Sequence, residues 1–493
     1  MPGLSYSLNI GLSGLQSAQS ALGVVGHNIS NVNTPGFSRQ RPILTTNPSQ
    51  IFGGLSYGAG TGVAAVESIR DRFLDLQILQ TTSVKSGMDI RYQTLEGISP
   101  VFDPSADANL NTLVQKFFQG FQDLAARPED AALRTNVVGK AQAMVNGLKD
   151  RYTLLTEQRN QANQAVASLV TQVNGLLSDI ASLNQQIANE IPKGSNNDGR
   201  DQRKEATDKL ASLIGVTAYE ASDGTYTIML DSGSASLVVG TTAYGLSLTP
   251  DPLNNNYNSV LVSLGGAATV NVTGQITGGE LGGRLDLRDN LLAGYNRQLD
   301  QLAAGIQSSV NLQHRTGFAL DGATTGLDFF QGGVANGANG LPATVNAAGF
   351  YLGAVSALTV NAAISANPTL IAAAGVAGAA GNNTNARAIA NLQSNPATVD
   401  TNGDGVADSG PFSTVIGALV NSIGTATSTL QSSTTTQENL LAALENQRQR
   451  ISGVDLDEEA SRLIAFQRAY QASARFLSVI DQLTDQLVNQ FGR

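Results

Sequence analysis

Apolar residues recur at alternating spacings of three and four at both ends of the chain, a pattern typical of helices with one narrow apolar stripe. The stripe residues are Leu8, Leu15, Leu22, Ile29, Gly11, Ala18, Val25 and Val32 at the N-terminal end, and Leu456, Leu463, Phe466, Tyr470, Leu477, Ile480 and Leu487 at the C-terminal end. Chain ends are usually polar and frayed, so these stripes need partners. They either pair within one subunit or stay open until subunits assemble, and we expect them to do both in turn.

The interior alternates between helical and strand-like patterns. Breakers at Asn33, Thr34, Pro35 and Gly36 end the first helix, and loosely alternating residues from 37 to 66 predict extended segments. Further helices are predicted at 68–96, 110–121, 129–190, 201–213, 281–313, 412–449 and from 456 to the end, with short strands between 216 and 272. Residues 320–411 are rich in Ala, Gly and Asn.

The longest element is predicted at 129–190. Leucine, valine and isoleucine keep heptad spacing from Leu148 to Ile187, and only Arg159 interrupts the series. At ~1.5 Å of rise per residue, this helix would be roughly 90 Å long, which favours an elongated molecule.

These patterns predict a mainly α fold with inserted β structure (α+β), in which the N- and C-terminal helices pair as a coiled coil. A chain of this length divides into several units. We expect a terminal helical tube domain at 1–60 plus 456–493, and a helical rod domain at 61–319 plus 412–455. The rod carries a β layer near 216–275, and an outer inserted domain occupies 320–411.

Composition excludes several classes of function. The 29 basic and 39 acidic side chains give a pI near 4.8, which opposes binding to nucleic acids and to anionic membrane surfaces. Cysteine is absent, so disulfides, thiolate metal sites and cysteine nucleophiles are unavailable. The first residues lack a secretory signal pattern and no stretch is expected to span a membrane, so we expect any export to proceed without a cleaved signal peptide.

Catalytic signatures are missing. His27 and His314 are the only histidines, and each is expected to bond to the backbone. Glycine-rich phosphate loops and nucleophile elbows do not occur in the sequence. The acidic run Asp457, Glu458 and Glu459 fits the first turn of the last helix, with Asp455 as its cap. We therefore predict no enzymatic activity and no cofactor.

One segment has the spacing of a calcium-binding loop. Its ligands would be Asp400, Asn402, Asp404, Val406 and Asp408, with Val406 donating a backbone carbonyl. The twelfth position is Pro411, where a bidentate Glu normally completes the sphere. The alternative is an Asp-Gly turn ahead of the next helix.

Two distant motifs resemble a known family. Residues 12–16 (LSGLQ) and 27–39 (HNISNVNTPGFSR) resemble the N-terminal signature of bacterial flagellar rod, hook and hook-associated proteins. Residues 454–460 (VDLDEEA) and 466–474 (FQRAYQASA) resemble the matching C-terminal signature. Interior stretches at 199–216, 278–285 and 311–317 resemble the hook-associated members.

This resemblance implies a structural protein of the extracellular flagellum that polymerises as a ring at the distal end of the hook and joins hook to filament. It implies paired terminal helices in the inner tube and a turn out of the tube wall. The turn residues are Asn28, Asn31, Asn33, Thr34, Gly36, Phe37 and Arg39. The implied assembly interface consists of Leu8, Leu15, Leu22, Val25, Ile29, Leu463, Phe466, Tyr470, Leu477, Ile480 and Leu487.

The resemblance also implies partners: copies of the chain itself, the hook protein and a second junction protein as neighbours, and a chaperone before type III export. The alternatives are another axial protein of the same family, either the hook protein or the second junction protein, and a secreted calcium-dependent adhesin or enzyme built around 216–411.

Overall fold

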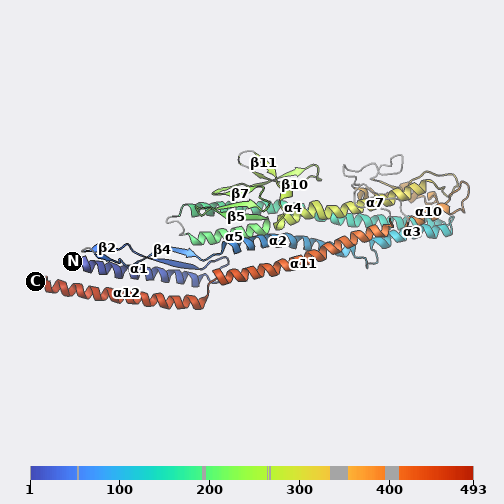
Figure 1. Cartoon of the computed structure of the whole chain (residues 1–493). Helices are drawn as coiled ribbons and strands as arrows, with labels where there is room; N and C mark the ends of the chain where they lie inside the picture. Colours follow the sequence, from blue (N-terminus) through green and yellow to red (C-terminus); the bar gives the residue numbers. More distant parts are fainter. Residues whose placement is uncertain are drawn as a thin grey trace.

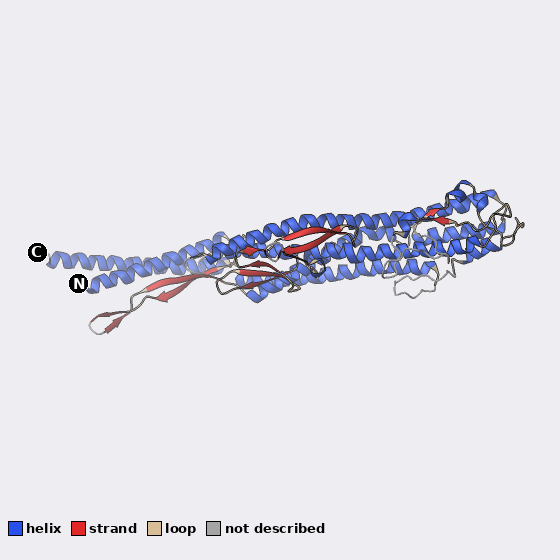
Figure 2. Ribbon diagram, turned by 90° about the horizontal axis from the view of Figure 1, so that it is seen from above, coloured by secondary structure: helices blue, strands red, loops and turns tan. Residues whose placement is uncertain are grey.

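The chain forms one elongated body with both termini at the same end (Figure 1). The computed structural model describes residues 2–52, 55–190, 196–263, 265, 268–332, 353–394 and 410–491. The longer helices are α1 (Pro2–Ser30), α2 (Arg72–Ile98), α3 (Leu110–Ala126), α4 (Ala131–Ala188), α5 (Asn197–Leu213), α7 (Leu292–Arg315), α11 (Phe412–Ser452) and α12 (Leu456–Phe491). After a quarter turn most of them still follow the long axis, so the molecule is a rod (Figure 2).

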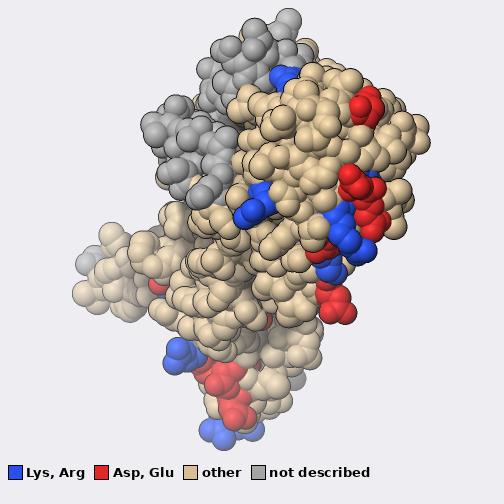
Figure 3. Space-filling view, turned by 90° about the vertical axis from the view of Figure 1, so that its right-hand side faces the viewer, with Lys and Arg blue, Asp and Glu red and all other residues tan. Residues whose placement is uncertain are grey.

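The end opposite the termini is held by an aromatic core. Helices α3, α4, α7 and the start of α11 contribute to one continuous cluster of buried apolar side chains. Phe117 lies at its centre, with its ring 5.5 Å from those of Phe121 and Phe330, while Phe118 stacks on Phe412 at 5.7 Å. Seen from this end, the surface is mostly uncharged, with a few acidic and basic side chains intermixed (Figure 3).

Part of the segment 320–411 packs into the same core. Its short elements are β12 (Phe330–Gln331), α8 (Ala354–Ala357), β13 (Thr359–Val360), α9 (Ala362–Ala366), η4 (Pro368–Leu370) and α10 (Thr384–Asn391). Val355, Ile371 and Ile389 are buried there together with residues of α3 and α4. The Ala- and Asn-rich composition predicted an outer domain, whereas the described part of this segment lies against the rod helices. The candidate calcium loop from Asp400 to Asp408 lies outside the described residues, so calcium binding there stays a prediction.

The β layer covers a second core beside α4 and α5. One sheet has the strand order β5-β6-β7-β8, and the other has the order β11-β10-β9. The strands are β5 (Val216–Glu220), β6 (Tyr226–Leu230), β7 (Ser236–Val239), β8 (Thr242–Ala243), β9 (Leu246–Asp251), β10 (Tyr257–Ser263) and β11 (Thr269–Asn271). All ladders are antiparallel, and their inward side chains pack on Val166, Val173 and Ile180 of α4.

Helix α4 joins the two cores. Asp130 caps it, since its Oδ1 accepts hydrogen bonds from the backbone N–H groups of Ala132 and Leu133. At ~1.5 Å per residue its 58 residues span about 87 Å. A window of this helix is long and apolar enough to cross a membrane by composition alone, contrary to the sequence-based expectation. The packing of its apolar side chains in both cores accounts for that composition.

Arg159, the residue that interrupts the heptad series of α4, has a defined partner. Its Nε donates to the backbone carbonyl of Arg288, 2.8 Å away, and its guanidinium lies 5.1 Å from the ring of Tyr257. Arg288 belongs to η3 (Leu287–Leu291), a π-helical turn between α6 (Gly279–Asp286) and α7. Such a turn disturbs the regular helical hydrogen bonds, and Arg159 bonds to a carbonyl within it.

At the terminal end, α1 is packed between α12 and a long β-hairpin. The hairpin consists of β1 (Gln40–Thr46), β2 (Gln50–Phe52), β3 (Leu55–Tyr57) and β4 (Thr61–Ser68), paired as β1 with β4 and β2 with β3. In both views the order across this end is hairpin, α1, α12 (Figures 1 and 2). α11 runs on from the aromatic end along α2 and stops where α12 begins.

Candidate assembly site

Small residues let α1 and α12 approach closely. The helices are antiparallel, with Gly11 opposite Leu477, Gly14 opposite Ser473 and Asn28 opposite Glu459. A Cβ atom at Gly11 would stand 2.7 Å from Leu477 Cδ2, and one at Gly14 would stand 2.9 Å from Ser473 Oγ. The backbone of α1 therefore lies directly against side chains of α12 along this face. The supercoiling implied by a coiled coil remains a prediction.

The predicted interface residues occupy different depths in this pair. Val25 and Ile480 are buried, and Leu8 is 41% exposed. The half-buried members are Leu15, Leu22, Ile29, Leu463, Phe466, Tyr470, Leu477 and Leu487. The face of α1 that packs on α12 is centred on the heptad register that begins at Gly11, because Ala18, Ala21 and Val25 are buried. Leu8 lies at the edge of this face.

A second apolar stripe on α12 is only partly covered within the described chain, where its Phe476 borders Gly11 of α1. It follows the heptad positions Ala465, Ala469, Ala472, Phe476, Val479 and Leu483, all of which are exposed. Phe476 and Leu483 are each exposed by more than two fifths, and Val479 by 53%. The sequence analysis did not predict this stripe. Its spacing of four and three is as regular as that of the stripe that packs on α1, so the pattern could have identified it.

The end of α1 is tied to α12 by one asparagine. Asn28 is 1% exposed, its Oδ1 accepts from the N–H of Gln40 at 2.9 Å, and its Nδ2 donates to the carbonyl of Gln40 at 2.8 Å. The same Nδ2 lies 3.0 Å from Oε2 of Glu459, whose side chain is fully buried. The sequence predicts only a helix-dipole role for Glu459, whereas its burial against Asn28 adds a specific contact across 431 residues.

Arg39 contacts both helices where α11 ends and α12 begins. Its backbone N–H donates to the carbonyl of Ser452 at 2.8 Å, and its guanidinium pairs with Glu458. Hydrogen bonds from Arg39 and Arg462 lower the pKa of Glu458. Asp455 caps α12 as expected, because its Oδ1 accepts from the N–H groups of the next turn.

The other predicted turn residues form the loop after α1. Asn31 Nδ2 donates to the carbonyl of His27 at 3.0 Å, and Thr34 Oγ1 donates to Asn31 Oδ1 at 3.1 Å. Gly36 has a φ of +80°, a conformation that favours glycine, and Phe37 lies edge-on to the ring of His27. Asn33 is exposed. The loop reverses the chain and leads it into β1.

Helix α5 anchors this loop to the rod. His27 Nε2 lies 3.2 Å from Asp198 Oδ1, so this histidine contacts a carboxyl group. The N–H of Ser38 donates to Asp201, which also pairs with Arg70 at the start of α2. Burial raises the pKa of Asp201, while Arg70 and Ser38 act in the opposite direction. We call the contacts of Asn28, Arg39, Glu459 and Asp201 the anchor cluster.

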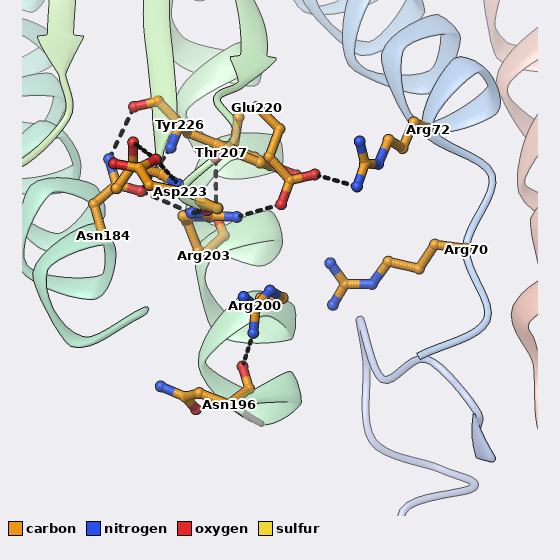
Figure 4. A network of polar contacts seen from close by, with 12 residues as sticks. Arg70, Arg72, Asn184, Asn196, Arg200, Arg203, Thr207, Glu220, Asp223 and Tyr226 are labelled. Atoms are coloured by element: carbon orange, nitrogen blue, oxygen red, sulfur yellow. Dashed lines mark hydrogen bonds and ion pairs between the residues drawn. The ribbon is translucent and has the colours of Figure 1, made fainter. Parts of the chain in front are cut away.

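A second polar network joins α5, the β layer and the start of α2 (Figure 4). Arg203 of α5 lies 3.6 Å from the ring centroid of Tyr226, and its Nη1 donates to Asn184 Oδ1 at 2.8 Å. Glu220 pairs with Arg72 at 2.9 Å. Arg72, Glu220 and Tyr226 line a cleft of about 770 Å³ between the base of β4, α2, α5 and β5. Among the residues that the structure describes, no group of three or more His, Asp or Glu side chains could hold a metal ion.

The sequence of the chain is similar to those of known flagellar proteins. Residues 95–330 match the model of the flagellar hook-associated protein FlgK helical domain. Residues 8–37 match the flagella basal body rod protein model, and residues 445–490 match the flagellar basal body rod FlgEFG protein C-terminal model. The chain is 31% identical to flagellar hook-associated protein 1 of Escherichia coli, over 99% of this chain and 100% of that one. The chain belongs to the flagellar hook-associated protein 1 family.

Two further similarities agree. Flagellar hook-associated protein 1 of Bacillus subtilis is 29% identical, over 97% of this chain and 96% of its own length. The solved flagellar hook junction protein FlgK from Burkholderia pseudomallei matches with a TM-score of 0.65 at 19% identity, covering 76% of this chain and all of that one, which shows a shared fold.

Family membership confirms several sequence-based predictions. The chain is a structural protein of the flagellar hook–filament junction and so part of the extracellular flagellum, as the terminal motifs indicated. The mainly α fold with inserted β is confirmed by the structure and by its neighbour. Membership in the axial family also indicates interaction with other hook and flagellar proteins.

Proposed function

We propose that the chain performs its junction role by polymerising with copies of itself into a ring at the distal end of the hook. The observation that carries this proposal is the exposed stripe of α12, from Ala465 to Leu483. A helix that covers one apolar stripe with α1 and leaves a second in water is set up to pack on another helix or strand. Its activity is assembly, and we propose no enzymatic reaction.

The α12 stripe supplies part of the energy of assembly. Phe476, Val479 and Leu483 are each about half exposed, so full burial of each would contribute about 1 kcal/mol. Every subunit in a ring has two neighbours, so the contribution is repeated around the circumference. In this arrangement the terminal domain at 1–60 plus 456–493 lines the tube, while the rod and 320–411 lie outside it.

The remaining partners extend this proposal. The hook protein would lie below the ring and the second junction protein above it, and a chaperone would hold the terminal helices before type III export. The charge-free α1, whose sequence lacks Lys, Arg, Asp and Glu, supports close packing of many copies without electrostatic repulsion.

Val479→Asp tests the proposal. The variant is produced in a flagellated strain that lacks its own copy, and Leu253→Asp serves as the control because Leu253 is 98% exposed on the β layer, far from the terminal helices. We expect V479D to give bare hooks and free junction protein in the medium, and L253D to give normal filaments. Normal filaments with V479D, at equal export and with an unchanged helical circular dichroism spectrum, would refute the proposal.

A further inference from the structure

The hairpin from Gln40 to Ser68 presents apolar side chains to solvent. Ile51 is 74% exposed and Leu55 63%, and Leu44 and Tyr57 are also exposed. From Pro42 to Val66 the sequence contains no charged residue. Exposed two-stranded ribbons usually carry charges that prevent unwanted pairing, and they are only marginally stable alone. An uncharged apolar tip of this kind indicates a surface that becomes covered.

The hairpin backbone is pressed onto α1. Ser17 Oγ donates to the carbonyl of Thr61 at 3.1 Å, and the N–H of Thr61 donates to Ser13 Oγ at 3.3 Å. A Cβ atom at Gly60, whose φ is +87°, would stand 2.1 Å from Ser13 Oγ. Tyr6 hydrogen-bonds the carbonyl of Gly58. These contacts fix the hairpin against one side of α1 and leave its apolar side chains directed elsewhere.

The hairpin and α12 lie on opposite sides of α1 (Figures 1 and 2). The hairpin tip and the exposed stripe of α12 also lie at the same level along the rod. Tyr57 packs edge-on against Tyr6, two residues from Leu8, and the antiparallel pairing of Gly11 with Leu477 brings Val479 to the level of Leu8. A rotation about an axis parallel to the rod therefore carries the tip of one copy toward the stripe of the next.

We propose that the hairpin of one subunit lies on the α12 stripe of the neighbouring copy, so that the junction ring is built from a repeated head-to-tail contact. Two different surfaces on opposite sides of one subunit give a heterologous interface, which closes into a ring or continues as a helix. The occupant is a second copy of this chain because both surfaces are apolar, neither requires an opposite charge, and both continue the α1–α12 pair. This inference rests on the proposed self-assembly.

The absence of cysteine from the chain makes a direct test possible. Ile51→Cys and Val479→Cys are introduced singly and together in a strain lacking its own copy, and isolated flagella are treated with a short bis-maleimide cross-linker. We expect the double variant to give a ladder of covalent oligomers on a denaturing gel. The two single variants should give only monomer separately, and a dimer when they are produced together. Leu253→Cys with Val479→Cys is the matched control and should stay monomeric.

The outcomes separate the two proposals. Cross-linking within a single variant would indicate a symmetrical contact and overturn the head-to-tail arrangement. Normal filaments with only monomer in the double variant would overturn the hairpin contact and leave self-assembly intact. A wild-type junction with one copy per hook, measured by quantitative mass spectrometry, would overturn both.

Discussion

Replacing Asn28 with alanine is expected to release the terminal domain while the rod stays folded. The side chain of Asn28 makes hydrogen bonds to both backbone groups of Gln40 and to the carboxyl group of Glu459. All three partner groups are in buried residues. Asn28→Ala therefore removes three hydrogen bonds and leaves the N–H and carbonyl of Gln40 and one oxygen of Glu459 without their partner.

The size of the effect follows from these buried groups. Leaving one buried polar group unsatisfied costs about 1–3 kcal/mol, and partial relaxation or water entry reduces the sum. We take about 3–6 kcal/mol for the loss in free energy of local opening at this point. Since 1.4 kcal/mol corresponds to a factor of ten, the terminal helices would open about 10²–10⁴ times more often.

Hydrogen exchange measured by mass spectrometry tests this expectation segment by segment. In N28A, amides of α1 and α12 near the anchor cluster should exchange faster by that factor, while those of α3 and α7 in the aromatic core should be unchanged. Asn33→Ala is the control, because Asn33 is exposed in the same loop. Equal protection of α1 and α12 in N28A and the wild type would refute the assignment of Asn28 as the tie between them. A uniform loss of protection throughout the rod would show that the terminal and rod domains unfold as one.

Two further predictions concern other parts of the molecule. Gly11→Ala should lower the stability of the α1–α12 pair by about 1–3 kcal/mol relative to Gly23→Ala, because a Cβ at Gly11 meets Leu477 and one at Gly23 meets nothing within 4 Å. Segment-resolved hydrogen exchange of both variants checks this, and equal effects would contradict the close approach. His314 donates from Nδ1 to the carbonyl of Leu327 and accepts from the N–H of Ala372 at Nε2, and burial lowers its pKa from 6.5 to about 4. Folding favours the neutral imidazole of His314. Its contribution to the free energy of unfolding is complete above pH 6.5 and falls by about 3 kcal/mol as the pH approaches 4. Urea unfolding of wild type and His314→Gln between pH 7 and 4.5 measures the difference. Burial raises the pKa of Asp300 to about 6, but this group titrates in both proteins and its contribution cancels. A difference that does not change with pH would refute the neutral buried histidine.

The helical framework was readable from the sequence because it depends on local periodicity. The predicted helix 129–190 corresponds to α4 at Ala131–Ala188, and its seam residues Leu155, Val166 and Val173 are fully buried. Asp130 caps its start, and a cap acts only on the N–H groups of the adjacent turn. Heptad spacing and helix capping can both be recognised from residues that are close together in the sequence.

The features that sequence reasoning missed depend on residues far apart in the chain. Arg159 interrupts a heptad series, and nothing near it in sequence indicates that the carbonyl of Arg288 and the ring of Tyr257 lie within its reach. Glu459 looked like one of three carboxyl groups at a helix start, whereas its burial depends on Asn28 at the other end of the chain. Periodicity identifies an apolar or polar face but does not identify what covers it.

The anchor cluster connects the α1–α12 pair to the rod at one end of the pair. The α1–α12 pair leaves the α12 stripe in water, so its packing is incomplete in one subunit. At its inner end, by contrast, Asn28 and Asp201 accept or donate buried hydrogen bonds, and the ion pairs of Arg39 with Glu458 and of Arg70 with Asp201 add to the connection of α1, α12 and α5. These directional contacts fix the angle between the α1–α12 pair and the rod. Apolar contacts with a neighbouring subunit are non-directional and depend mainly on the apolar area that they bury. In the proposed assembly, a subunit would present its terminal helices in a set direction, and burial of the second stripe would follow without reorganising the rod.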